Sequence, residues 1–162
     1  MEVELKAIGP NQVELLREPM LALHRHEASI QPALGHAPVR SDDEFWQRYA
    51  EWFVRSYRIG DGFCIVALSG EQAVGMVFGV VREGILGFDA GERIGYIEDI
   101  AVLESSRGDG VGSALMERAR SEFVARGLTS FQLSTVPNND GARAFYAKFG
   151  LQPAAHLLIG QL

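Results

Sequence analysis

The chain has 162 residues, of which 47% are hydrophobic, and a formal net charge of −6 at pH 7. This length and apolar content fit one domain with a single core, spanning residues 1–162. The acidic balance argues against a nucleic-acid partner, and no apolar run approaches the ~20 residues of a membrane helix. The N-terminus lacks the features of a signal peptide, and the single cysteine, Cys64, cannot form an internal disulfide. We therefore expect a cytoplasmic protein.

The first sixty residues predict one strand and two helices. Residues 3–8 form the strand, and Asn11 is a suitable N-cap for the helix that follows it. Residues 29–40 contain two prolines and a glycine, which predict a loop. The next helix begins at Ser41 or Asp42. The apolar stripes of the two helices consist of Val13, Leu16, Met20 and Leu23, and of Phe45, Tyr49, Trp52 and Phe53.

The rest of the chain predicts a hairpin and then alternating strands and helices. Residues 63–69 and 73–82 are rich in β-forming residues and are joined by Gly70-Glu71. A helix over residues 111–126 has an inward face of Val111, Leu115, Ala119 and Phe123. The remaining predicted elements are strands at 93–102, 130–136 and 155–159 and a helix at 139–149, and Gly127 and Gly150 end the two helices.

A glycine-rich turn, Arg107-Gly-Asp-Gly-Val-Gly112, separates a predicted strand from a predicted helix. Its glycines let the backbone approach a ligand closely, and the helix start offers unpaired N–H groups and a positive dipole end. Such a turn is typical of a site for an anion, most often a phosphate. A nucleotide P-loop is excluded because no lysine follows Gly112. A dinucleotide fingerprint is excluded because Ser113 stands where its third glycine belongs.

Two motifs resemble those of the GNAT (GCN5-related N-acetyltransferase) family. Tyr96-Ile-Glu-Asp-Ile-Ala-Val102 together with Arg107 to Gly112 resembles the acetyl-CoA motif, and Asn139 to Leu151, with its Phe145-Tyr146 pair, resembles the second signature. The resemblance is specific over residues 93–151. It implies a single GNAT-like α/β (α+β) fold, with a mixed central sheet flanked by helices. It also implies an enzyme that moves an acetyl group from acetyl-CoA to an amine.

The resemblance also implies where acetyl-CoA binds. The pantetheine arm would lie along the main chain of Ile100, Ala101 and Val102, and Arg107 would stand at the turn. Asn139 would bind the cofactor or hold the strands apart, although a plain N-cap is an alternative. The pyrophosphate would rest on the backbone N–H groups of Gly108, Asp109, Gly110, Val111, Gly112 and Ser113. Because a carboxylate repels a pyrophosphate, we expect the Asp109 side chain to point to water. No metal is implied.

The chemistry needs a base and an acid. An alkyl ammonium has a pKa near ~10.4 and must lose a proton before it attacks. Glu98 and Asp99 are neighbours on one strand, so we expect them on opposite faces, with only one in the cleft. Glu98 is favoured because Tyr96 and Ile100 share its face; a water chain is the alternative. Tyr146 matches the family tyrosine that would protonate the departing thiolate, and a core aromatic is the alternative.

The acceptor carries no motif that the sequence identifies. A small-molecule amine or a peptide amine fits equally well. A non-catalytic acyl-CoA-binding or regulatory domain is the alternative function, because it would keep the glycine turn without needing Glu98 or Tyr146. Only about a dozen residues follow Gly150, so the pairing of the last strand is open. A second subunit of a homodimer would cover that edge.

Overall fold

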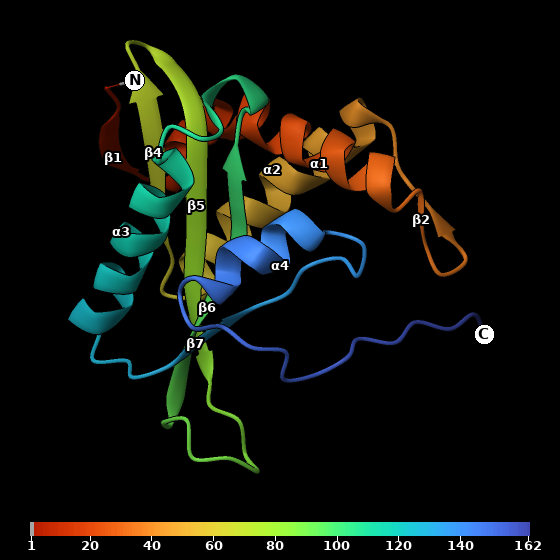
Figure 1. The fold of residues 1–162 in the computed structure, drawn as a ribbon, viewed down its shortest axis with the longest axis vertical. Helices are drawn as coiled ribbons and strands as arrows, with labels where there is room; N and C mark the ends of the chain where they lie inside the picture. The colour runs from red at the N-terminus through yellow and green to blue at the C-terminus, as the bar shows by residue number, and fades with distance from the viewer. Residues whose placement is uncertain (1) are drawn as a thin grey trace.

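In the computed structural model, which describes residues 2–162, five strands form one mixed sheet (Figure 1). Neighbouring strands run antiparallel, except that the last pair is parallel. The predicted α/β class with a mixed central sheet is confirmed. In sheet order the strands are β1 (Glu4–Ile8), β4 (Phe63–Ser69), β5 (Gln72–Glu83), β6 (Arg93–Val102) and β7 (Phe131–Leu133).

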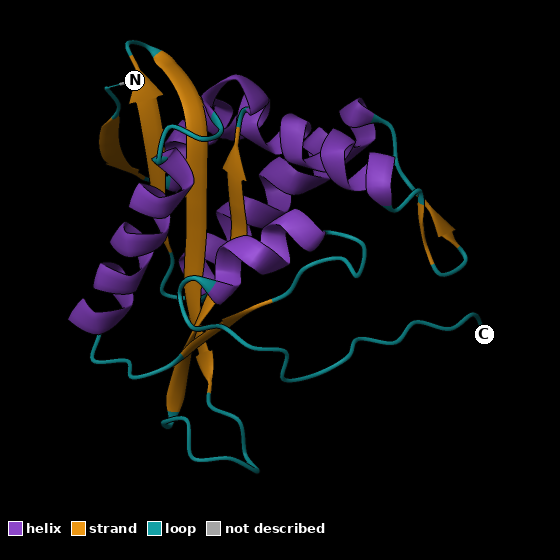
Figure 2. Cartoon of the chain, viewed as in Figure 1, coloured by secondary structure: helices purple, strands orange, loops and turns teal. Residues whose placement is uncertain are grey.

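Helices cover both faces of this sheet, so that it forms the middle layer (Figure 2). One core lies between the sheet and α3 and α4, and is centred on Ile97 and Leu115. A second core lies between the opposite face and α1 and α2, and is centred on Phe53 and Phe78. The helices are η1 (Pro10–Leu16), α1 (Arg17–Ile30), α2 (Asp42–Ile59), η2 (Glu104–Ser106), α3 (Val111–Ala125) and α4 (Asp140–Ala147).

Local sequence signals account for the boundaries of several elements. The Ser41 side chain accepts a hydrogen bond from the Glu44 backbone and the Glu44 side chain accepts one from Ser41, which makes a complete capping box for α2. Gly70 has a φ of +61° in the turn between β4 and β5, as the predicted hairpin requires. All four residues predicted to face inward from α3, Val111, Leu115, Ala119 and Phe123, are buried.

The structure corrects the predicted start of the first helix. Asn11 does not act as its N-cap, because Gly9 precedes a 3-10 helix that begins at Pro10, and the α-helix begins only at Arg17. Proline is well tolerated at the first position of a helix, so it moves the start one residue ahead of Asn11. Non-helical torsion angles at Gln12 (φ −110°, ψ 21°) then interrupt this first segment.

The predicted loop over residues 29–40 is also more ordered than expected. Helix α1 continues to Ile30. Two short strands, β2 (Ala33–Leu34) and β3 (Ala37–Pro38), then pair as a small hairpin. Gly35 has a φ of +58° in its turn, a conformation that glycine adopts without strain.

The C-terminal strands differ most from the prediction. Strand β7 ends at Leu133 rather than at residue 136, because β6 and β7 pair over only three residues and then diverge. The strand predicted at 155–159 does not form, and residues 151–162 have no regular structure. The side chains of Leu157 and Leu158 are 85% and 89% exposed. In the described sheet this segment pairs with no strand, and β7 remains an edge strand.

Two further observations bear on the class of protein. Among residues 2–162, each helix is too short or too polar to cross a lipid bilayer. Cys64 is free and buried within β4, where it acts as a small apolar side chain. The cytoplasmic location inferred from the single cysteine stays a prediction.

Candidate active site

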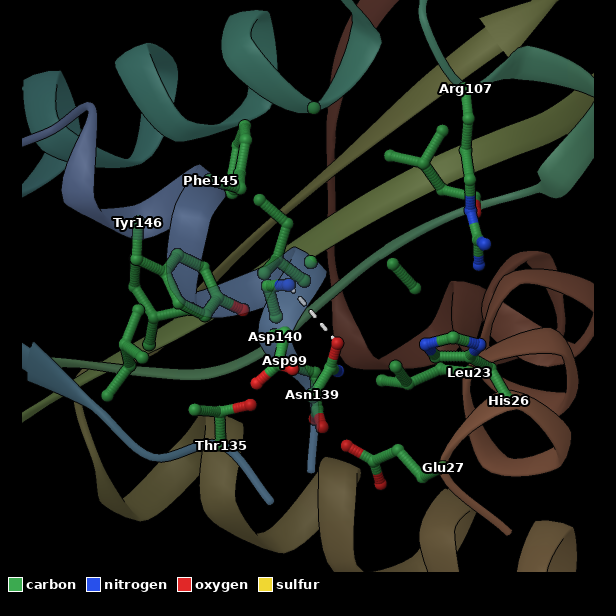
Figure 3. A pocket seen from close by; sticks show the side chains of 18 of the residues that line it. Leu23, His26, Glu27, Asp99, Arg107, Thr135, Asn139, Asp140, Phe145 and Tyr146 are labelled. Atoms are coloured by element: carbon green, nitrogen blue, oxygen red, sulfur yellow. Dashed lines mark hydrogen bonds between the residues drawn. The ribbon is translucent and has the colours of Figure 1, made fainter. Parts of the chain in front are cut away.

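A cleft of about 710 Å³ opens where β6 and β7 diverge. The two strands pair only between Gly95–Ile97 and Phe131–Leu133, so beyond Ile97 the edge of β6 that faces β7 has no strand partner. Ligands of α/β proteins commonly bind in such a crevice, at the carboxyl ends of parallel strands. Figure 3 shows side chains from α1, β6 and α4 pointing into the cleft from different sides.

The glycine turn before α3 forms one end of the cleft. Gly108 and Gly110 have φ values of +88° and +83°. The first helical hydrogen bond of α3 runs from the Ala114 N–H to the Gly110 carbonyl. The N–H groups of residues 111–113 lie before this bond and therefore have no acceptor within the helix. Unpaired N–H groups and the positive end of the helix dipole together favour a phosphate at this position. That this turn binds the pyrophosphate of an acyl-CoA stays a prediction.

Most of the residues predicted to bind the cofactor line this cleft. They are Ile100, Ala101, Val102, Arg107, Gly108, Gly110, Gly112, Ser113 and Asn139. Val111 is an exception, because its side chain is buried in the core and only its backbone can contribute. Asp109 is exposed and does not line the cleft, as expected for a carboxylate beside an anion site. Whether these residues bind the cofactor stays a prediction.

Arg107 and Asn139 hold the backbone around the cleft. The Arg107 Nε donates a hydrogen bond to the Val102 carbonyl at 3.3 Å, which ties the turn to the end of β6. The buried Asn139 side chain accepts a hydrogen bond from the Ala142 N–H at 3.1 Å, so it is the N-cap of α4. The N-cap alternative for Asn139 is therefore confirmed.

A β-bulge in β6 overturns the expected placement of Glu98 and Asp99. Phe78 of β5 pairs with Asp99, and its neighbour Gly79 pairs with Ile97, so Glu98 is an extra residue without a partner. A bulge reverses the alternation of side chains beyond it. Glu98 and Asp99 consequently both lie on the face covered by α1 and α2, and both line the cleft. The prediction that only one of them reaches the cleft is wrong.

The same bulge separates residues that were expected to share a face. Tyr96 packs with the core under α1 and α2, whereas Ile100 packs with the core under α3. Because an extra residue lies between them, even spacing along the strand no longer means the same face. The reason given for preferring Glu98 over Asp99 as the base therefore does not hold.

The two carboxylates have different surroundings. Glu98 accepts a hydrogen bond from Arg82, whose guanidinium also lies 3.5 Å from the centre of the Tyr96 ring. Asp99 accepts a hydrogen bond from the Tyr49 hydroxyl at 3.1 Å. Burial raises the pKa of Asp99 to about 7; the Tyr49 hydrogen bond opposes this rise, and the charges of Glu98 and Glu27 add to it. Asp99 can thus exchange a proton near neutral pH.

Tyr146 lies on α4, and its hydroxyl points into the cleft (Figure 3). Burial raises the pKa of Tyr146 to about 12, and the charges of Glu27 and Asp99 add to the rise. The phenol therefore stays protonated at neutral pH and is able to donate a hydrogen bond or a proton.

The resemblance implies that the first two helices help to build the acceptor pocket, but the sequence analysis named no residue of α1 there. Leu23, His26, Glu27 and Ile30 all line it, at the spacing of one helix face. A carboxylate at position 27, within the apolar stripe that continues from Met20 and Leu23, was the available signal. Thr135 and Lys148 line the cleft without any local motif to indicate it. Within residues 2–162, no three His, Cys, Asp or Glu side chains are grouped so that they could hold a metal ion.

Comparison with known families now adds to this geometry. The model of the Acetyltransferase (GNAT) family matches residues 21–151, which is most of the chain. The chain belongs to the GNAT family. The family is named for acetyltransferases, which agrees with the resemblance seen in the sequence.

Two curated relatives are similar over parts of the chain. The aminoglycoside 2′-N-acetyltransferase of Mycolicibacterium fortuitum is 38% identical over 74 residues, which are 46% of this chain and 36% of the relative. An uncharacterised N-acetyltransferase of Archaeoglobus fulgidus is 30% identical over 106 residues, which are 65% of this chain and 69% of the relative. The match thus spans about a third of the length of the aminoglycoside enzyme.

Solved structures share the fold over nearly the whole chain. A GCN5-related N-acetyltransferase from Ralstonia eutropha JMP134 has a TM-score of 0.78 and 21% identity, with 99% of both chains covered. The aminoglycoside N-acetyltransferase AAC(6′)-Iy in complex with CoA has a TM-score of 0.70 and 15% identity, with 99% of this chain and 95% of that chain covered. At these identities the likeness shows the GNAT fold.

Proposed function

We propose that this enzyme transfers the acetyl group of acetyl-CoA to a primary amine by direct attack. The observation that carries the proposal is the cleft itself, because it joins the anion-binding turn at residues 108–113 to the unpaired edge of β6. An extended pantetheine arm can hydrogen-bond such an edge as an added strand does. That a similar fold was solved with CoA bound supports acetyl-CoA as the donor.

The proposed reaction uses one carboxylate and one phenol. The carboxylate accepts a proton from the acceptor ammonium, and the amine nitrogen then attacks the thioester carbonyl carbon. As the carbon–sulfur bond breaks, the thiolate takes a proton from the Tyr146 hydroxyl, which points into the same cleft. The nitrogen still carries a surplus proton after its attack, and this proton passes to the Tyr146 oxygen as the tetrahedral intermediate collapses. The carboxylate releases its own proton to water, so the products are the acetylated amine, free CoA and one proton.

Glu98 was the base favoured from the sequence, and two observations now support Asp99 instead. Arg82 holds Glu98 in an ion pair, so this carboxylate already has a cationic partner within the protein. Asp99 has a pKa of about 7, so it accepts a proton near neutral pH. In this proposal Glu98 contributes through its charge, which raises the pKa of Asp99.

The test is release of the CoA thiol from acetyl-CoA in the presence of primary amines. An acetyltransferase releases thiol only when an amine is present, and Tyr146→Phe should lower kcat by about 100-fold while acetyl-CoA binding is retained. Calorimetric titration of acetyl-CoA, with NAD as the comparison, measures that binding. Binding without turnover, equal in both variants, would favour the alternative of an acyl-CoA-binding or regulatory domain.

The acceptor we propose is a small-molecule amine. Supporting this, the curated relative from Mycolicibacterium fortuitum is named for acetylation of aminoglycosides. The acceptor side of the cleft also presents the acidic groups Glu27 and Asp99, which suit a cationic amine. A peptide amine is the alternative; comparing free amino compounds with a peptide of matched charge as acceptors separates the two.

We also propose a homodimer, in which a second copy covers the C-terminal segment. Strand β7 pairs on one side only, with β6, and Leu157 and Leu158 of the C-terminal segment are exposed. An open strand edge and exposed apolar side chains are features that association commonly covers. Sedimentation equilibrium should give a dimer for the whole chain and a monomer for a chain ending at Gly150. A monomer in both cases would refute this proposal.

A further inference from the structure

Four carboxylate side chains line the cleft, and they differ in their partners. Three of them have donors: Arg82 for Glu98, the Tyr49 hydroxyl for Asp99, and Arg143 for Asp140. The fourth, Glu27, receives no side-chain hydrogen bond or ion pair from any residue between 2 and 162. A partly buried carboxylate without a donor is uncommon, because burial removes water that would otherwise solvate its charge.

The surroundings of Glu27 explain why its charge is poorly solvated. It lies on α1 between Leu23 and Ile30, whose apolar side chains line the same part of the cleft. Burial raises the pKa of Glu27, and only the imidazoles of His26 and His24 act against that rise. A cation from outside the protein would provide the partner that this carboxylate lacks.

Glu27 faces the groups that we propose for the reaction. Figure 3 shows its carboxylate directed into the cleft from α1, opposite Asp99 and Tyr146. The charge of Glu27 reaches both of them, since it raises the pKa of Asp99 and of Tyr146. The other charged groups lining the cleft are Arg107 and Lys148, and neither forms an ion pair with Glu27.

From this arrangement we infer that Glu27 binds a second ammonium group of the acceptor, so that the enzyme prefers diamines and polyamines to monoamines. The inference rests on the proposed acetyl transfer. One amino group lies at Asp99 and is acetylated, while the other pairs with Glu27 across the cleft. Glu27 is therefore a specificity-determining residue that acts mainly on acceptor binding.

The test compares α,ω-diaminoalkanes of increasing length with 1-aminoalkanes of the same length. For the wild-type enzyme we expect kcat/KM to favour the best diamine over its monoamine by about 10- to 100-fold, the range of one hydrogen-bonded charge pair. Glu27→Gln should abolish this preference, because the KM for diamines should rise much more than the KM for monoamines. Glu18→Gln is the matched control, because Glu18 lies on the same helix but is exposed and outside the cleft.

A second variant keeps the charge and moves it. Glu27→Asp shortens the side chain by one methylene, so the preferred diamine should become longer while the preference itself remains. Equal kcat/KM ratios for the wild type and Glu27→Gln would overturn the inference. If the wild type acetylates no amine, the proposed function fails. Calorimetric titration of the diamines into the CoA-saturated wild type and Glu27→Gln then decides whether Glu27 binds an ammonium group. Equal diamine affinities for the wild type and Glu27→Gln would then overturn it.

Discussion

Replacing Asp99 by asparagine should affect stability and activity in opposite directions. The amide oxygen can still accept the hydrogen bond from the Tyr49 hydroxyl, which is 3.1 Å from the carboxylate, but the charge is removed. In the folded protein burial raises the pKa of Asp99 from 3.8 to about 7. Between these pH values the folded state holds a proton that the unfolded state has released. The Asp99 carboxyl therefore stabilises the fold at low pH, and this stability is lost as pH rises through about 7.

The expected change in unfolding free energy follows from the width of the pH interval between these two pKa values of Asp99. Each pH unit inside it is equivalent to about 1.4 kcal/mol of unfolding free energy. Between pH 5 and pH 8 the wild type should lose about 2 to 3 kcal/mol relative to Asp99→Asn, and little more above pH 8. For a chain of this size, 1 kcal/mol changes Tm by about 2–4 °C. The difference in Tm between the variant and the wild type should thus increase by about 5–10 °C.

Thermal melts of both proteins from pH 5 to pH 8 measure this difference, and groups that the substitution leaves alone cancel from it. In parallel, kcat/KM of the wild type should fall as pH drops below about 7, because a protonated Asp99 cannot act as a base. Asp99→Asn should lose most activity at every pH. If the Tm values of the two proteins changed in parallel with pH, the raised pKa of Asp99 would be refuted. If Asp99→Asn kept its activity, the role of Asp99 as the base would be refuted.

Three further substitutions test neighbouring parts of the structure. Tyr49→Phe removes the hydrogen bond that lowers the pKa of Asp99, so the acidic limb of kcat/KM should move to higher pH; an unchanged limb would mean that the contact is unimportant. Gly110→Ala places an L residue at φ +83°, which should cost about 1 kcal/mol and weaken acetyl-CoA binding by about 10-fold in calorimetry. Ser41→Ala breaks the capping box of α2, and melting should show a loss of about 1 kcal/mol with unchanged acetyl-CoA affinity.

Several features of the fold and the site could be predicted because they depend on a few adjacent residues. Ser41 and Asn139 are N-caps because each side chain accepts a hydrogen bond from the backbone N–H three residues later in the chain. The glycine turn depends on backbone torsion angles that Gly108 and Gly110 adopt without strain. The buried face of α3 follows from the helical period. For these features the chemical cause lies within one or two turns of the chain.

The sequence by itself therefore determined the order of most elements, the N-caps of α2 and α4, and the glycine turn before α3. Only the tertiary structure decided which side chains meet in the cleft. The bulge that brings Asp99 beside Glu98 exists in the pairing of β6 with β5, where Phe78 and Gly79 skip one residue. Glu27 faces Asp99 because α1 packs across β6, about seventy residues away in the chain. Local propensity carries no information about such register and packing, because their energies arise between distant segments.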